Sequence, residues 1–163
     1  MDYRQQLIDQ IKSRALVYLE VYDTLAGSLG AERAEELLAA SIYRRGCRVG
    51  CKFERYAPAD FAGLRDAFIK GVPGEGELFA PEVKRCDAQG LEIHFHACPL
   101  KDAWAEAGLS QEKIALLCRI AGRVDNGTFE SAGFGIDATT WAPGAGGCCS
   151  LRITRRAPTV RPQ

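Results

Sequence analysis

The spacing of apolar residues changes period near residue 80, and this change constrains the fold more than any other feature of the chain. Before it, apolar side chains recur every three or four residues, as on one face of a helix. This spacing predicts amphipathic helices over 2–27 and 31–56, and a short third helix over 60–71. We therefore expect the first half of the chain to be helical.

The second half predicts strands with two further helices between them. Residues 82–86 and 91–97 flank a short turn and read as a β-hairpin. Pro99 suits the first position of a helix, and Ser110 suits the N-cap of the next one. Residues 126–147 are rich in glycine and are expected to form an ordered loop before a last strand.

These elements predict an α+β fold, with N-terminal helices packed on a small antiparallel sheet formed by the C-terminal half. Strand 91–97 is expected to pair with both 82–86 and 148–154. Residues 1–154 are expected to form a single domain, and 155–163 a flexible tail.

Composition limits the partners. Lys plus Arg and Asp plus Glu each number 21 in 163 residues, so no net charge favours nucleic acid or an anionic membrane surface. The polar N-terminus lacks a signal-peptide core, and no apolar run reaches membrane-spanning length. We expect a cytoplasmic protein that binds a small molecule, without nucleic acid or membrane as partner, and we leave homo-oligomer formation open.

The seven cysteines point to the chemistry. An odd number cannot form a fully paired disulfide framework in one chain, so reduced thiols are expected. Several lie in short motifs of the second half, together with conspicuous Asp and Gly residues: Cys98-Pro-Leu-Lys-Asp-Ala-Trp104, Cys118, Asp125, Gly133 and Gly147-Cys-Cys-Ser-Leu-Arg-Ile153.

These motifs resemble those of the L-2-amino-thiazoline-4-carboxylic acid hydrolase family, over most of residues 80–155. The resemblance implies a hydrolase that opens a small cyclic substrate at a C–N or C–S bond, at a cysteine-centred site. The chain is also similar to the 4-vinyl-reductase-type small-molecule-binding domains, which share an α+β build and a late Gly-x-x-Cys-x-hydrophobic strand. That similarity implies the alternative, a sensory domain that binds a small molecule or a metal without catalysis.

Hydrolysis of an aminothiazoline needs a nucleophile at the amidine-like carbon, a proton donor for the departing atom and a group that binds the carboxylate. Cys98 is the candidate nucleophile, because it lies at a strand-to-helix junction where the helix dipole favours a thiolate. Its alternative role is that of a small buried residue.

Three further residues of the motifs are catalytic candidates, each with a structural alternative. Cys118 lies on the apolar face of its helix and suits the core. Asp125 is either a turn residue before Asn-Gly or an acid/base close to Cys98. Cys149 faces inward on the last strand, where it belongs to the core or lines a pocket, and Cys148 faces the opposite side.

The two histidines, His94 and His96, share a strand face with Cys98. His96 could act as an acid/base beside Cys98, since imidazole titrates near neutral pH. The His-x-His-x-Cys row could also bind zinc or iron, or could simply face solvent. We expect no cofactor and keep the zinc or iron site as the alternative.

A basic edge on the second helix supplies candidate substrate-binding residues. Arg44, Arg48, Lys52 and Arg55 recur at three- and four-residue spacing. This edge is either a solvated face or a carboxylate anchor, formed by Arg44 and Arg48. Trp104 of the first motif is the third candidate for substrate binding.

Overall fold

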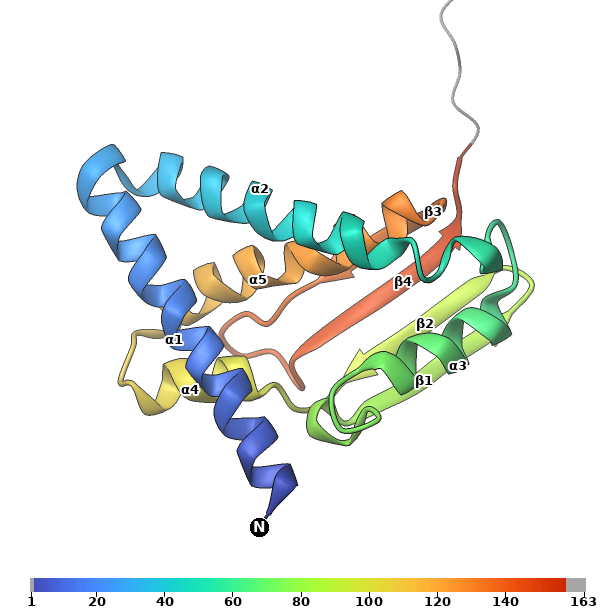
Figure 1. The fold of residues 1–163 in the computed structure, drawn as a ribbon, viewed down its shortest axis with the longest axis horizontal. Coiled ribbons are helices and arrows are strands. Elements are labelled where there is room, and N and C mark those ends of the chain that lie inside the picture. The colour runs from blue at the N-terminus through green and yellow to red at the C-terminus, as the bar shows by residue number, and fades with distance from the viewer. Residues whose placement is uncertain (1, 158–163) are drawn as a thin grey trace, which may run out of the picture.

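The computed structural model describes residues 2–157. Helices dominate its first half and a sheet its second half, which confirms the α+β class (Figure 1). The elements in chain order are α1 (Tyr3–Leu29), α2 (Ala31–Gly50), η1 (Glu54–Tyr56), α3 (Phe61–Gly71), η2 (Glu77–Phe79), β1 (Pro81–Asp87), β2 (Gly90–Phe95), α4 (Pro99–Glu106), α5 (Gln111–Ser131), β3 (Phe134–Thr139) and β4 (Cys149–Arg155). Of the expected tail, residues 158–163 lie outside the described residues.

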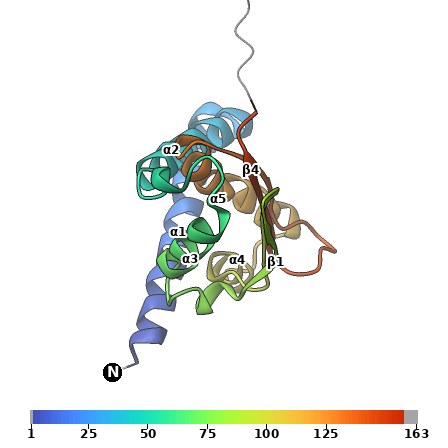
Figure 2. The same cartoon turned by 90° about the vertical axis from the view of Figure 1, so that its right-hand side faces the viewer.

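The four strands form one antiparallel sheet in the order β1-β2-β4-β3. Strand β2 pairs with β1 through the hairpin and with β4 on its other side, as the sequence predicted. Seen nearly edge-on, the sheet has α1, α2, α3 and α5 on one side (Figure 2). Buried and exposed residues alternate along the strands because helices cover one face of the sheet and leave the other uncovered.

The most extensive contact between two helices joins α2 to α5, and glycines make it possible. Gly46 and Gly50 lie one turn apart in α2, where each costs about 1 kcal/mol of helix propensity, so their presence predicts a close approach. The structure confirms it, because a Cβ built on Gly50 would lie 2.5 Å from the carbonyl oxygen of Thr128. On α5, a Cβ on Gly127 would lie 3.0 Å from the backbone nitrogen of Cys47.

Two expected boundaries are wrong. The second helix ends at Gly50, not at residue 56, and the chain then turns into η1. The predicted loop 126–147 is mostly regular structure, because α5 continues to Ser131 and β3 occupies Phe134–Thr139. The glycines of this segment misled the prediction: Gly127 is a packing residue against α2, and Gly133, with φ of 100°, makes the turn from α5 into β3.

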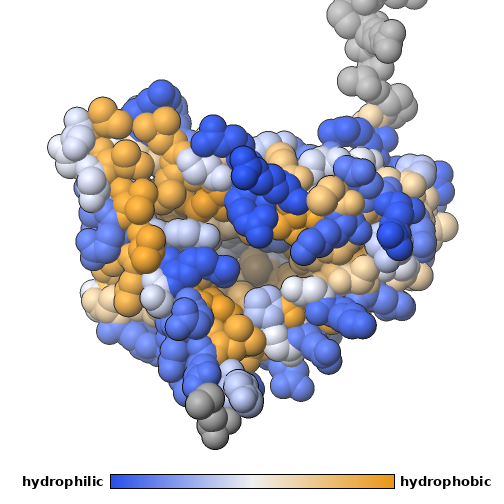
Figure 3. All heavy atoms as spheres, viewed as in Figure 1, coloured by the Kyte–Doolittle hydropathy of each residue, from blue (hydrophilic) through white to orange (hydrophobic). Residues whose placement is uncertain are grey.

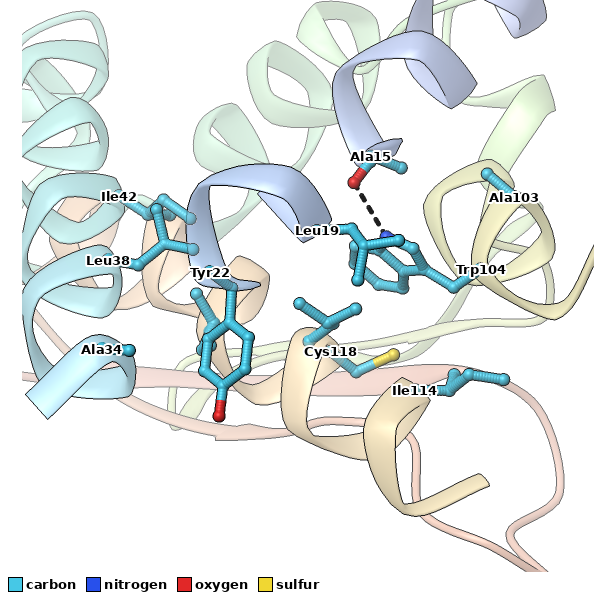
Figure 4. Packing of buried hydrophobic residues seen from close by; sticks show 12 residues of the cluster. Ala15, Leu19, Tyr22, Ala34, Leu38, Ile42, Ala103, Trp104, Ile114 and Cys118 are labelled. Carbon is cyan, nitrogen blue, oxygen red and sulfur yellow. Dashed lines mark hydrogen bonds between the residues drawn. The ribbon is translucent and has the colours of Figure 1, made fainter. Parts of the chain in front are cut away.

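The buried side chains form two clusters rather than one. The first joins α1, α2, α4 and the first part of α5, and the indole N–H of Trp104 donates a hydrogen bond of 2.8 Å to the Ala15 carbonyl oxygen within it (Figure 4). The second joins the sheet to α3, to the end of α5 and to Phe53 after α2. The space between these two clusters is where the candidate site lies.

Within residues 2–157, we find no helix that combines the length and the apolar character needed to cross a bilayer.

Candidate functional site

A cavity of about 340 Å³ lies between the two clusters and is bounded by α1, α2, α3, η2, α4, α5 and the sheet. The space-filling view shows the molecule hollowed near the centre of the face that carries α1, α2 and α3 (Figure 3). Most of the lining is apolar, so the few polar groups on its wall are easily singled out. A volume of this size suits a small organic ligand.

Four cysteines from three separate segments line this cavity. Cys98 precedes α4, Cys118 lies in α5, and Cys148 and Cys149 lie where β4 begins. The sequence predicted the convergence of Cys98, Cys118 and Cys149 with Asp125, and all four line the cavity. Cys148 was expected to face away, yet it is buried and lines the same cavity, because it precedes the regular strand pairing of β4. All seven cysteines are free.

Cys98 is placed by the local sequence. Pro99 occupies the first turn of α4, which leaves Cys98 as the extended N-cap residue. Burial raises the pKa of the Cys98 thiol to about 11, although backbone N–H groups of Lys101 and Leu100 act in the opposite direction. The thiolate expected from the helix dipole is therefore not favoured, because desolvation outweighs these hydrogen bonds.

The other cavity thiols are neutral for the same reason. Burial raises the pKa of Cys118 to about 12, and it also raises the pKa values of Cys148 and Cys149. The negative charge of Asp125 acts in the same direction on the pKa of Cys149, and both groups line the cavity. At neutral pH the free protein thus presents a set of protonated thiols to the cavity.

Among residues 2–157, Asp125 is the one acidic side chain on the cavity wall. It lies within α5, so the alternative of a turn residue is wrong. No group in the described part of the chain donates a hydrogen bond to its carboxylate, and burial raises its pKa to about 7. A carboxyl group with this pKa can both accept and donate a proton near neutral pH.

Three cations also line the cavity: Arg14 from α1, Lys52 after α2, and Lys101 from α4. Lys101 is half-buried, and its ammonium lies 5.5 Å from the centre of the Trp141 ring. Arg14 and Lys52 are exposed, and neither forms an ion pair with any described residue. These groups can attract and hold an anionic ligand.

The histidines lie apart from the cavity. His94 is hydrogen-bonded to Glu92 at 3.1 Å, and the exposed His96 to Glu82 at 2.7 Å. Neither lines the cavity, so the structure does not bring His96 together with Cys98 and Asp125. Among residues 2–157, no three His, Cys, Asp or Glu side chains are arranged to hold a metal ion. Zinc or iron at His94, His96 and Cys98 stays a prediction.

The substrate-binding candidates divide in the same way. Trp104 is fully buried in the first cluster and contributes to the cavity wall. Arg44 and Arg48 are exposed on α2 and do not line the cavity, whereas Lys52 of the same basic edge does. Helical spacing found the right group of cations, but only the packing of the turn after α2 shows which of them reaches the site.

Helices on one face of an antiparallel sheet, with a partly open cavity of ligand size between them, define an α+β protein. The chain belongs to the L-2-amino-thiazoline-4-carboxylic acid hydrolase family, because a sequence model of that family matches residues 9–153. The match extends through the helical first half, beyond the motifs that carried the resemblance. No curated protein matches the chain.

Among solved structures, the chain is similar to the phenol-responsive sensory domain of the transcription activator PoxR, described in complex with phenol. The TM-score is 0.59 at 15% identity, over 94% of this chain and 91% of that domain. At this identity the similarity establishes a shared fold.

Sequence reasoning missed several residues of the site. Lys101 was visible inside the first motif, and its position three residues after Cys98 was the available signal. Arg14 and the aromatic side chains of the wall gave no such signal, because they come from elements whose relative placement is tertiary. The wall aromatics that it missed are Phe53, Phe68, Phe79, Phe95 and Trp141, whereas Trp104 was predicted.

Proposed function

We propose that this cavity binds a small cyclic amidine that carries a carboxylate and hydrolyses it, with Asp125 as the general acid/base. The observation that carries this proposal is the convergence of Asp125 with Cys98, Cys118, Cys148 and Cys149 on one cavity. Membership of a family named for a hydrolase supports it.

The proposed reaction uses water as the nucleophile. The ionised Asp125 takes a proton from a water molecule as the water oxygen bonds to the amidine carbon, and gives it to the ring nitrogen as the C=N double bond becomes single. Asp125 then takes the remaining hydroxyl proton as the C=O bond forms and gives it to the ring atom that leaves. One C–O bond forms, one ring bond breaks, and Asp125 returns to its carboxylate. The cations Lys101, Lys52 and Arg14 are suited to hold the substrate carboxylate.

Attack by a cysteine is the second route to the same product. Cys98 is the nucleophile that the sequence suggests, but its raised pKa requires a base before it can attack. Asp125 and Cys149 line the same cavity, which makes Cys149 a second thiol to test.

The test measures turnover of 2-amino-thiazoline-4-carboxylate, and chromatography monitors the opening of the ring. We expect Asp125→Asn to lower kcat by about 100-fold or more, as for the loss of a general base. Cys98→Ala and Cys149→Ala should retain most of the activity, and Cys118→Val should serve as the control for a change in the cavity wall. Loss of turnover in Cys98→Ala, with its fold intact by circular dichroism, would replace water attack by covalent catalysis. Full activity in Asp125→Asn would contradict the proposed role of Asp125.

Binding without catalysis is the second candidate function. The mainly apolar wall and the protonated thiols favour it, and the sensory domain with the same fold is described with a bound small molecule. This alternative would be established if the ligands bind saturably and none of them is converted to a product.

A further inference from the structure

The cavity has an aromatic wall on the side of the second cluster. Phe53 follows α2, Phe68 lies on α3 and Phe79 ends η2, and all three line the cavity. Across the cavity lie Trp104 and Cys118, which belong to the first cluster. The two sides therefore come from different clusters, and the phenylalanine rings Phe53, Phe68 and Phe79 lie on one of them.

This wall is backed by a further ring. The rings of Phe53 and Phe68 meet edge to face with centres 6.0 Å apart. Behind them the fully buried Phe129 lies 5.0 Å from Phe68 and 6.3 Å from Phe53. The three rings pack against one another, and Phe68, which is only half-buried, presents an apolar surface to the cavity.

The size of the cavity exceeds what the simplest substrate would fill. A five-membered ring with an amino group and a carboxylate occupies only part of about 340 Å³. The reacting ring would lie at Asp125 and the thiols, which leaves the aromatic wall without a partner. An apolar group placed against this wall would add affinity through burial and ring contacts.

We infer that the ligand carries an aromatic or branched aliphatic substituent, which lies against Phe53, Phe68 and Phe79. This inference rests on the proposed function for the orientation of the ring at Asp125. The substrate class is thus a substituted cyclic amidine carboxylate rather than the bare ring.

The test compares two ligands by fluorescence titration, because both tryptophans, Trp104 and Trp141, line the cavity. The ligands are 2-amino-thiazoline-4-carboxylate and its N-benzyl derivative. We expect the benzyl compound to bind at least about tenfold more tightly, since it buries an additional ring. Turnover of both is measured in parallel.

Val49→Phe tests the location of the substituent. Val49 lies on α2 one turn before Phe53 and lines the cavity, so a larger side chain there fills the space beside the aromatic wall. We expect the preference for the benzyl compound to disappear while binding of the bare ring is retained. Val17→Phe is the control, because Val17 is 55% exposed on α1 and lies outside the cavity. If Val49→Phe does not fold, Phe68→Leu should reduce the same preference.

The outcomes separate the two proposals. A preference for the benzyl compound that Val49→Phe abolishes, with no turnover of either ligand, would support this inference and contradict hydrolysis. Turnover with equal Kd values for the two ligands would support hydrolysis and contradict this inference. A preference that persists in Val49→Phe would overturn the placement at the aromatic wall, and failure of both ligands to bind would overturn both proposals.

Discussion

At the scale of single residues, burial decides the chemistry of the site. The same desolvation raises the pKa of the cavity thiols and the pKa of Asp125. Its effect on reactivity at neutral pH is opposite for the two kinds of group. A thiol with a pKa of about 11 is a poor nucleophile at neutral pH, whereas a carboxyl with a pKa of about 7 is well matched to proton transfer. The environment thus shifts the candidate chemistry from Cys98 to Asp125.

The raised pKa of Asp125 predicts how stability depends on pH. Between the unfolded pKa of 3.8 and the folded pKa of about 7, the folded state binds more protons than the unfolded state. The free energy of unfolding should therefore fall as pH rises through this window. Denaturant titrations at pH 4 to 8 should show this fall to be smaller in Asp125→Asn. An equal pH dependence in the two proteins would show that Asp125 is not desolvated in the folded state.

If Asp125 is the base, kcat/KM should rise as pH increases through about 7.

At the scale of elements, the contact of α2 with α5 sets the width of the cavity. Both helices carry cavity residues, Val49 on α2 and Cys118 and Asp125 on α5. Their backbones approach so closely because Gly46, Gly50 and Gly127 have no side chains. A change at these positions acts on the site through the spacing of the helices.

Gly127→Ala should destabilise the protein by about 1–3 kcal/mol or more, since the added Cβ meets the backbone of α2. Gly27→Ala is the matched control, because Gly27 lies in α1 with no atom within 4 Å of its added Cβ. That change should stabilise by about 0.5–1 kcal/mol through helix propensity. Urea denaturation of the two variants checks the prediction, and similar losses at both sites would show that the close approach is not what requires glycine.

At the scale of the whole molecule, the cavity separates two hydrophobic clusters that the α2–α5 contact holds side by side. A ligand that fills the cavity contacts both clusters and binds only the folded state. Occupancy should therefore stabilise the entire fold rather than one half of it.

Thermal unfolding should show this effect as a single transition. A ligand at about 100 times its Kd adds about 2.7 kcal/mol, which shifts the Tm by roughly 5–10 °C for a chain of this length. The N-benzyl aminothiazoline carboxylate is the ligand to use, with the Val49→Phe variant as the control for site-specific binding. A ligand-dependent splitting into two transitions would show that the clusters unfold independently.

The sequence by itself determined the α+β class and the hairpin, because helical and strand periodicities are local properties. The pairing of β2 with β4 was predicted correctly, but it joins distant segments and is not a local property. It also indicated that Cys98, Cys118, Asp125 and Cys149 belong together, through motifs that resemble a family. It misplaced residues 126–147, because a glycine that allows two helices to touch looks the same in sequence as a glycine in a loop. Only the tertiary structure decided which groups face the cavity: Cys148 and Lys52 do, whereas His96, Arg44 and Arg48 do not. It alone decided the protonation of the site as well, since desolvation depends on every element packed around a group and not on its neighbours in the chain.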